Sequence, residues 1–84
     1  MDREEIISRL KPIVATYAKD KEALENITEE TDFINDLKIN SANLVDVVLD
    51  IEEEFDIEID DEAMERMLNV SAAITVIEIK LQEK

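Results

Sequence analysis

The absence of glycine from this 84-residue sequence constrains the fold more than any other feature. Glycine supplies the positive φ angles that tight β-hairpin turns need, so a chain without it has few ways to connect many short strands. The sequence also has only one proline and two phenylalanines. We therefore predict an all-α fold in which polar connections join the helices.

Length and apolar content predict one folded domain that covers residues 1–84. A chain of this size buries about 60% of the surface that its unfolded form exposes. Leu, Ile, Val and Phe account for 27 of the 84 residues. That share is well above the level of a disordered protein, so we expect the chain to fold despite its heavy charge.

Negative charge dominates the composition. The formal net charge of −14 repels the phosphates of nucleic acids and of anionic membranes. We therefore expect no nucleic-acid binding and protein partners that are basic. Between residues 39 and 65 there are eleven Asp or Glu and no Lys or Arg. This acidic block is either a solvated face or a docking surface.

The sequence has no cysteine, which excludes disulfides, thiolate-bound metals and a thiol nucleophile of the chain itself. The first ten residues lack the apolar run of a signal peptide. No segment approaches the roughly 18 apolar residues of a membrane helix. We expect a soluble, cytoplasmic monomer that does not insert into membranes.

Apolar residues that recur every three or four positions predict the first helix. Asp2 and Glu5 have the spacing of a capping box at its start, and the pattern runs to about Ala18. Pro12 lies within this pattern, and proline removes an amide donor and presses on the preceding turn. We predict either a kink at Pro12 or a late start of the helix.

A long polar connection follows from residue 19 to 32, and we expect it to touch the core twice. Thr31 or Asp32 is suited to cap a short turn at its end. Its apolar anchors are Ala23, Leu24 and Ile27.

Asn40 is expected to cap a second helix that runs from Ser41 to about Phe55. At about 100° per residue, this helix has three faces. The core face consists of Leu44, Val47, Val48, Ile51 and Phe55. The acidic face consists of Asn43, Asp46, Asp50, Glu53 and Glu54. The third face is an apolar strip of Ala42, Val45 and Leu49.

Asp60 is expected to cap a short third helix, residues 62–68, and Asn69 or Ser71 to cap a fourth that continues to the carboxyl end. The prediction is a small antiparallel four-helix bundle, with three main helices, a short one and a long first connection.

The apolar strip of the second helix and the acids beside it fit a basic, apolar groove on a partner. The alternative for Val45 is that the long connection covers it as part of the core, and the alternative for Leu49 is an ordinary exposed leucine. The predicted docking residues are Ala42, Val45, Asp46, Leu49, Asp50, Glu52 and Glu53.

Ser41 stands at the expected start of the second helix, in a sequence without histidine or cysteine. No base is available to activate its hydroxyl, so we predict neither catalytic residues nor an enzyme. A serine at this place is most often a cap or an exposed polar residue. A phosphate joined to its oxygen would also meet the positive end of the helix dipole.

The segment from Thr31 to Glu78 resembles the acyl carrier protein family in the order and spacing of its features. These are Phe33, the Asp36–Leu37 pair, Ser41, the EEEF helix end at residues 52–55, and Ile57, Ile59 and Asp60. The resemblance covers about two thirds of the chain. The set of features is specific, although each one alone is a weak signal.

The resemblance implies that Ser41 carries a covalent 4′-phosphopantetheine, which a phosphopantetheinyl transferase takes from coenzyme A. It implies that the thiol of this arm holds acyl groups as thioesters for enzymes of fatty acid, lipid or polyketide-type biosynthesis. These acyl-transfer and chain-elongating enzymes would have basic docking surfaces. The bundle would shelter the acyl chain, and our candidates for the lining are Ile51, Ile59, Met64, Leu68 and Ile74.

The sequence departs from the family pattern around the serine. Asn40, Ala42 and Asn43 stand where the family usually has aspartate, leucine and aspartate, and Lys38 replaces a glycine. We interpret the chain as a divergent, specialised carrier.

Two alternatives use the acidic residues in other ways. One is an interaction module that binds a basic protein without any prosthetic group. The other is calcium sensing by the acids of residues 56–62, but this segment lacks the glycine and the alternating oxygen ligands of an EF-hand loop. We expect at most weak divalent binding that relieves charge repulsion, and we predict no metal site.

Overall fold

Helix α1 spans Arg3–Ala15 in the computed structural model, which describes residues 2–83. Asp2 is its N-cap, and Oδ1 of Asp2 accepts a hydrogen bond from the Glu5 amide at 2.8 Å. This bond satisfies one of the amides that have no partner in the first turn of a helix. The helix continues through Pro12, so the predicted late start is wrong, while the kink stays a prediction. It ends at Ala15, earlier than the predicted Ala18.

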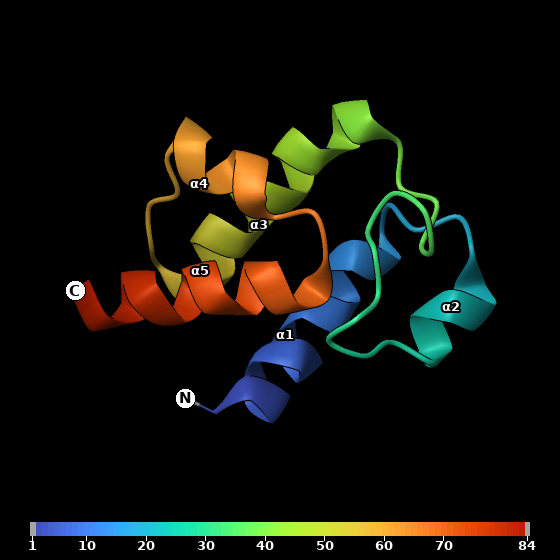
Figure 1. The fold of residues 1–84 in the computed structure, drawn as a ribbon, viewed down its shortest axis with the longest axis horizontal. Coiled ribbons are helices and arrows are strands. Elements are labelled where there is room, and N and C mark those ends of the chain that lie inside the picture. The colour runs from blue at the N-terminus through green and yellow to red at the C-terminus, as the bar shows by residue number, and fades with distance from the viewer. Residues whose placement is uncertain (1, 84) are drawn as a thin grey trace.

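A short helix, α2 (Lys21–Glu25), lies within the first connection, where the sequence predicted no helix. Asp20 caps it, because Oδ1 of Asp20 accepts the Ala23 amide at 3.0 Å. Leu24 is buried, and it anchors the helix to the core. In Figure 1, α2 lies at one end of the molecule, opposite the start of α1 and the end of α5 (Val70–Glu83).

The predicted second helix begins as a single 3₁₀ turn, η1 (Ser41–Asn43), and continues as α3 (Leu44–Phe55). Its end at Phe55 is as predicted. Asp56 follows with a φ angle of 54°, in the left-handed conformation that often terminates a helix. Oε2 of Glu52 then accepts the Ile59 amide at 2.7 Å, which fixes the chain as it leaves α3.

Two polar caps start the remaining helices. Oδ1 of Asp60 accepts the Ala63 amide at 2.8 Å at the start of α4 (Asp61–Arg66), which ends before the predicted residue 68. Oδ1 of Asn69 accepts the Ala72 amide at 2.8 Å at the start of α5. The structure therefore uses Asn69 as the cap, and Ser71 lies inside the helix.

Helix α1 packs between α3 and α5, and α4 packs against α5. Figure 1 shows that α1 runs in one direction while α3 and α5 run back. The small helical bundle that the sequence predicted is confirmed, and residues 2–83 contain no β-strand. None of the helices described is both long and apolar enough to cross a bilayer. The largest fully buried side chains are Phe33, Ile6, Leu10, Leu37, Ile39, Ile51, Ile74 and Ile77.

The first connection pairs with the link between α4 and α5. Asp32 and Asn69 form an isolated antiparallel bridge. Beside it, the Phe33 amide donates to the Leu68 carbonyl at 3.2 Å, and the Val70 amide donates to the Thr31 carbonyl at 2.9 Å. These bonds bring Phe33 and Leu68, which are distant in sequence, next to each other.

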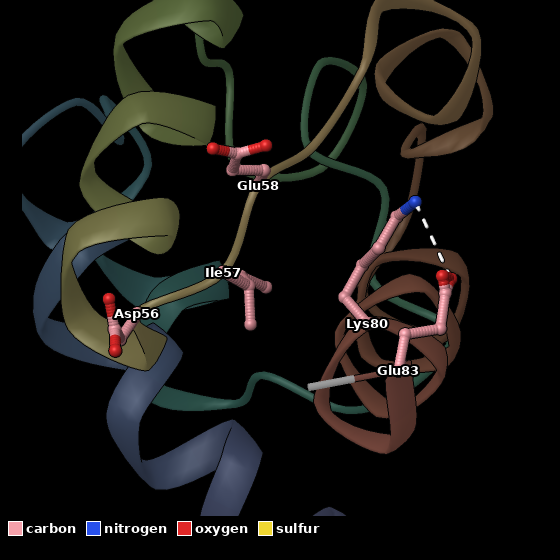
Figure 2. A pocket seen from close by; sticks show the side chains of 5 residues that line it. All are labelled: Asp56, Ile57, Glu58, Lys80 and Glu83. Carbon is pink, nitrogen blue, oxygen red and sulfur yellow. Dashed lines mark ion pairs between the residues drawn. The ribbon is translucent and has the colours of Figure 1, made fainter.

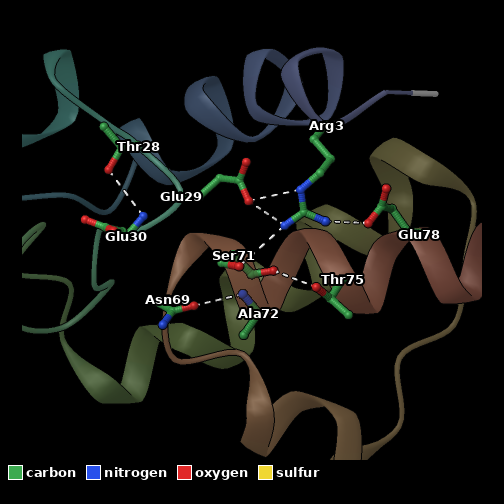
Figure 3. Close-up of polar contacts among 9 residues, drawn as sticks. All are labelled: Arg3, Thr28, Glu29, Glu30, Asn69, Ser71, Ala72, Thr75 and Glu78. Carbon is green, nitrogen blue, oxygen red and sulfur yellow. Dashed lines mark hydrogen bonds and ion pairs between the residues drawn. The ribbon is translucent and has the colours of Figure 1, made fainter.

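Arg3 at the start of α1 contacts both the first connection and α5 (Figure 3). Its Nε donates to Oε1 of Glu29 at 3.0 Å, and its Nη1 donates to Oε1 of Glu78 at 2.6 Å. Nη2 also lies 3.4 Å from Oγ of Ser71. One guanidinium group thus ties the start of α1 to the first connection and to α5.

Candidate functional site

Ser41 is exposed and is the first residue of η1. Asn40 holds this turn, because its Oδ1 accepts the Ala42 amide at 2.9 Å and its carbonyl accepts the Asn43 amide at 2.8 Å. None of the hydrogen bonds within residues 2–83 uses the Ser41 hydroxyl. The hydroxyl is therefore accessible, on a turn whose backbone is fixed by its neighbour.

An apolar cavity of about 280 Å³ opens beside Ser41. Ser41 is itself one of the lining residues, and its exposure places it at the opening. Helix α3 contributes more of the lining than any other element, and Phe33 forms part of the wall. The other lining residues are Leu44, Val45, Val47, Val48, Ile51, Met64, Glu65, Met67 and Leu68.

Three of the five residues predicted to line an acyl pocket contribute to this cavity: Ile51, Met64 and Leu68. Ile59 and Ile74 do not. Ile74 is fully buried in the core, and Ile59 is partly buried and packs on the core elsewhere. The helical pattern identifies both as apolar contacts, but periodicity alone does not separate a cavity wall from solid packing. The same limit explains why Phe33, Val48 and Met67 were not predicted.

The strip of Ala42, Val45 and Leu49 is exposed, with Ala42 in η1 and the other two residues on α3. Val45 is 48% exposed and Leu49 is 52% exposed. The alternative in which the long connection covers Val45 is therefore wrong. Asp46 and Glu53 are exposed on the same helix, so the strip has carboxylates beside it. Val45 also belongs to the cavity lining, which places the strip directly beside the opening.

Two of the predicted docking acids have contacts within the fold. Oδ2 of Asp50 accepts a hydrogen bond from the Tyr17 hydroxyl at 3.0 Å. Glu52 is half-buried, and its carboxylate holds the Ile59 amide. The fold thus engages Asp50 and Glu52, whereas Asp46 and Glu53 are exposed. Tyr17 was not singled out from the sequence, because its partner is 33 positions away.

A second, polar depression lies away from Ser41, between the segment after α3 and the end of α5 (Figure 2). Its volume is about 470 Å³, and its lining is Asp56, Ile57, Glu58, Lys80 and Glu83. Nζ of Lys80 lies 3.8 Å from Oε1 of Glu83. The depression contains none of the predicted site residues. In the described part of the chain, no group of three or more acids has the arrangement to hold a metal ion.

The comparisons with known proteins agree with this geometry. Residues 8–77 match the family described as "Phosphopantetheine attachment site". The sequence is 37% identical to an acyl carrier protein of Coprothermobacter proteolyticus over 84 residues, which cover 100% of both chains. It is 39% identical to an acyl carrier protein of Thermotoga maritima over 79 residues, 94% of this chain and 95% of the relative.

The chain belongs to the acyl carrier protein family. A solved structure supports the same assignment: that of an acyl carrier protein from Enterococcus faecalis, described by its high thermal stability. Its TM-score is 0.75 at 29% sequence identity, with 95% of this chain and 99% of that chain covered. The resemblance noted in the sequence is thereby confirmed.

Family membership makes this protein a carrier rather than an enzyme, and its cofactor is covalently bound 4′-phosphopantetheine. Membership of this family also implies that the protein interacts with enzymes that handle acyl groups. The residues present fit this cofactor. A serine hydroxyl without a hydrogen-bond partner is open to modification, and the cavity beside it is lined mostly by apolar side chains, with Glu65 as the charged residue of its lining.

Proposed function

We propose that Ser41 is the attachment point of 4′-phosphopantetheine and that the protein presents acyl groups to partner enzymes. The observation that carries this proposal is the exposed Ser41 hydroxyl at the opening of an apolar cavity. When bound, the cofactor supplies the thiol that holds an acyl group as a thioester. The chain itself has no cysteine that could compete for this role.

The cavity is the proposed shelter of the acyl chain. Ile51, Met64 and Leu68 keep the lining role that the sequence predicted, joined by Phe33 and Val48. Each methylene that leaves water for this wall contributes about 0.8 kcal/mol. A medium-length chain therefore offsets the cost of widening the gap between α3 and α4.

The exposed side of α3 is the proposed docking surface for the transferase and for acyl-transfer and chain-elongating enzymes. Leu49 and Val45 supply apolar contact, and Asp46 and Glu53 attract a basic groove. These enzymes would belong to fatty acid, lipid or polyketide-type biosynthesis. The cytoplasmic location and the monomeric state expected from the sequence stay predictions.

Incubation with coenzyme A and a panel of phosphopantetheinyl transferases tests the proposal. Intact mass should rise by one phosphopantetheine in the wild type and in Ser8→Ala, which removes an exposed serine on α1. Ser41→Ala should gain no mass. Failure of every transferase, including one from the native host, to modify the wild type would remove the support for the proposal, as would modification of Ser41→Ala.

The exposure of Val45 and Leu49 beside Asp46 and Glu53 also suits an interaction module that needs no prosthetic group. The two functions differ in their dependence on Ser41. For such a module, Ser41→Ala leaves partner binding and cellular function intact, while Asp46→Lys with Glu53→Lys abolishes both. For the carrier, cellular function is lost both in Ser41→Ala and in the variant that combines Asp46→Lys with Glu53→Lys.

A further inference from the structure

Lys38 has a φ angle of 59°, in the left-handed region that residues with a Cβ atom enter at an energetic cost. Hydrogen bonds in the turn around Lys38 hold this positive φ angle. The amides of Asp36 and Leu37 both donate to the Asp32 carbonyl at 3.1 Å, and the Ile39 amide donates to the Phe33 carbonyl at 3.0 Å. Such a turn favours glycine, so a lysine here is a costly choice for the fold alone.

The backbone around Lys38 is held firmly. Leu37 is fully buried and Ile39 is 1% exposed, so both neighbours are anchored in the core. The Leu37 carbonyl accepts hydrogen bonds from the amides of Lys19 and Asp20 at 3.0 and 3.2 Å. Lys38 itself is exposed. A hydrogen-bonded turn with two buried neighbours thus presents a cationic side chain to solvent.

The charge of Lys38 has no partner within the described structure. None of the ion pairs among residues 2–83 includes it. Lys38 also directly precedes the acidic block, residues 39–65, in which no Lys or Arg occurs. Ser41 lies three positions further along the chain, and three steps of chain span at most about 11 Å. The flexible lysine side chain covers much of that distance.

A cation close to Ser41 would stabilise a phosphate joined to its hydroxyl. Asn40 already occupies the amides of Ala42 and Asn43, so the start of η1 offers fewer free donors than a helix start usually does. We propose that the Lys38 ammonium pairs with the phosphodiester that joins the prosthetic group to Ser41, and so restricts the first part of the arm. This inference rests on the proposed function, because the phosphodiester is present only if Ser41 is modified.

Nuclear magnetic resonance on the apo and modified proteins tests the pairing. Modification, confirmed by intact mass, should shift the ¹³Cε resonance of Lys38 and leave that of Lys19 in place. Lys19 is the matched control because it is exposed and its backbone bonds to the same turn. Addition of salt should reverse the Lys38 shift, since salt screens an exposed ion pair.

Two variants separate charge from backbone strain. Lys38→Gln keeps a residue with a Cβ atom at the positive φ angle and removes the positive charge. Lys38→Arg keeps the Cβ atom and the positive charge. The gain in Tm on modification should be smaller in Lys38→Gln than in the wild type by roughly 1 to 5 °C, and Lys38→Arg should match the wild type.

An unmoved Lys38 resonance in fully modified wild-type protein would overturn the inference while leaving the proposed function intact. A protein that no transferase modifies would defeat the proposed function first. An equal shift when inorganic phosphate is added to the apo protein would also overturn the inference, since the response would then not need the attached group.

Discussion

The hydroxyl of Tyr17 donates a hydrogen bond to Oδ2 of Asp50 at 3.0 Å, which joins the segment after α1 to the proposed docking helix. The bond holds one carboxylate of α3 in a fixed direction. It also favours the protonated phenol, because a phenolate would face the charges of Asp50 and Asp46. The pKa of Tyr17 is accordingly raised above its ordinary value of 10.0, first through this hydrogen bond and then through burial and these charges.

An absorbance titration of the phenolate measures this relationship directly, because Tyr17 is the only tyrosine in the sequence. The pKa of Tyr17 should lie above 10.0 in the wild type and fall towards that value in Asp50→Asn. The stabilisation that protonated Tyr17 gives the fold is present below pH 10 and is lost as pH rises through the raised pKa of Tyr17. A matched control is Glu53→Gln, which removes an exposed acid of α3. Equal titrations in wild type and Asp50→Asn would contradict the prediction.

The contact between Arg3 and Glu29 predicts a pH dependence at the acid side. The Arg3 hydrogen bond and charge lower the pKa of Glu29 below its ordinary value of 4.5. Its contribution to stability is therefore fully present above about pH 4.5 and is lost as pH falls through the lowered pKa. Urea unfolding should show that Glu29→Gln is less stable than the wild type at pH 7, with a difference that shrinks below pH 4.5.

Glu30→Gln is the control for this comparison. It removes one negative charge from the same connection, so both variants reduce the repulsion within the acidic protein equally. The Glu30 side chain is exposed, so the free energy of unfolding of Glu30→Gln should equal or exceed that of the wild type. If Glu29→Gln is as stable as Glu30→Gln at pH 7, the ion pair of Arg3 and Glu29 contributes nothing to the free energy of unfolding.

Two isoleucines of α5 provide a matched test of the core. Ile77 is fully buried and Ile79 is 50% exposed. Ile77→Ala should lower the free energy of unfolding by about 2 to 5 kcal/mol, from lost burial and the cavity left behind. Ile79→Ala should change it by less than about 1 kcal/mol, as exposed positions usually do. Similar losses in the two variants would mean that the packing of α5 is misassigned.

The cavity beside Ser41 predicts that an attached acyl chain stabilises the fold. Tm should rise with chain length when the modified protein is loaded with saturated acyl groups, until the cavity is filled. Leu68→Trp adds bulk at the cavity and should abolish this rise. Ile79→Trp is the control, because Ile79 is about equally exposed and does not line the cavity. A rise that survives in Leu68→Trp would place the acyl chain elsewhere.

Local chemistry made several elements predictable. Asp2, Asn40 and Asp60 cap turns or helices where the sequence placed them, since a cap depends on side chain and backbone atoms within a few residues. The faces of α3 were predictable for the same reason, because a long helix fixes the directions of its side chains. Helix α2 was missed, as five residues are too few for a periodic pattern.

The sequence by itself determined the main helices, the caps Asp2, Asn40 and Asp60, the apolar strip of the helix that follows Ser41, and the family. These depend on residues that are neighbours along the chain. Only the tertiary structure decided that Ile51, Met64 and Leu68 line a cavity while Ile59 and Ile74 do not. It also decided that Tyr17 holds Asp50 and that Arg3 joins Glu29 to Glu78. These contacts join segments that are distant in the sequence, so they arise from how the helices pack and not from any local pattern.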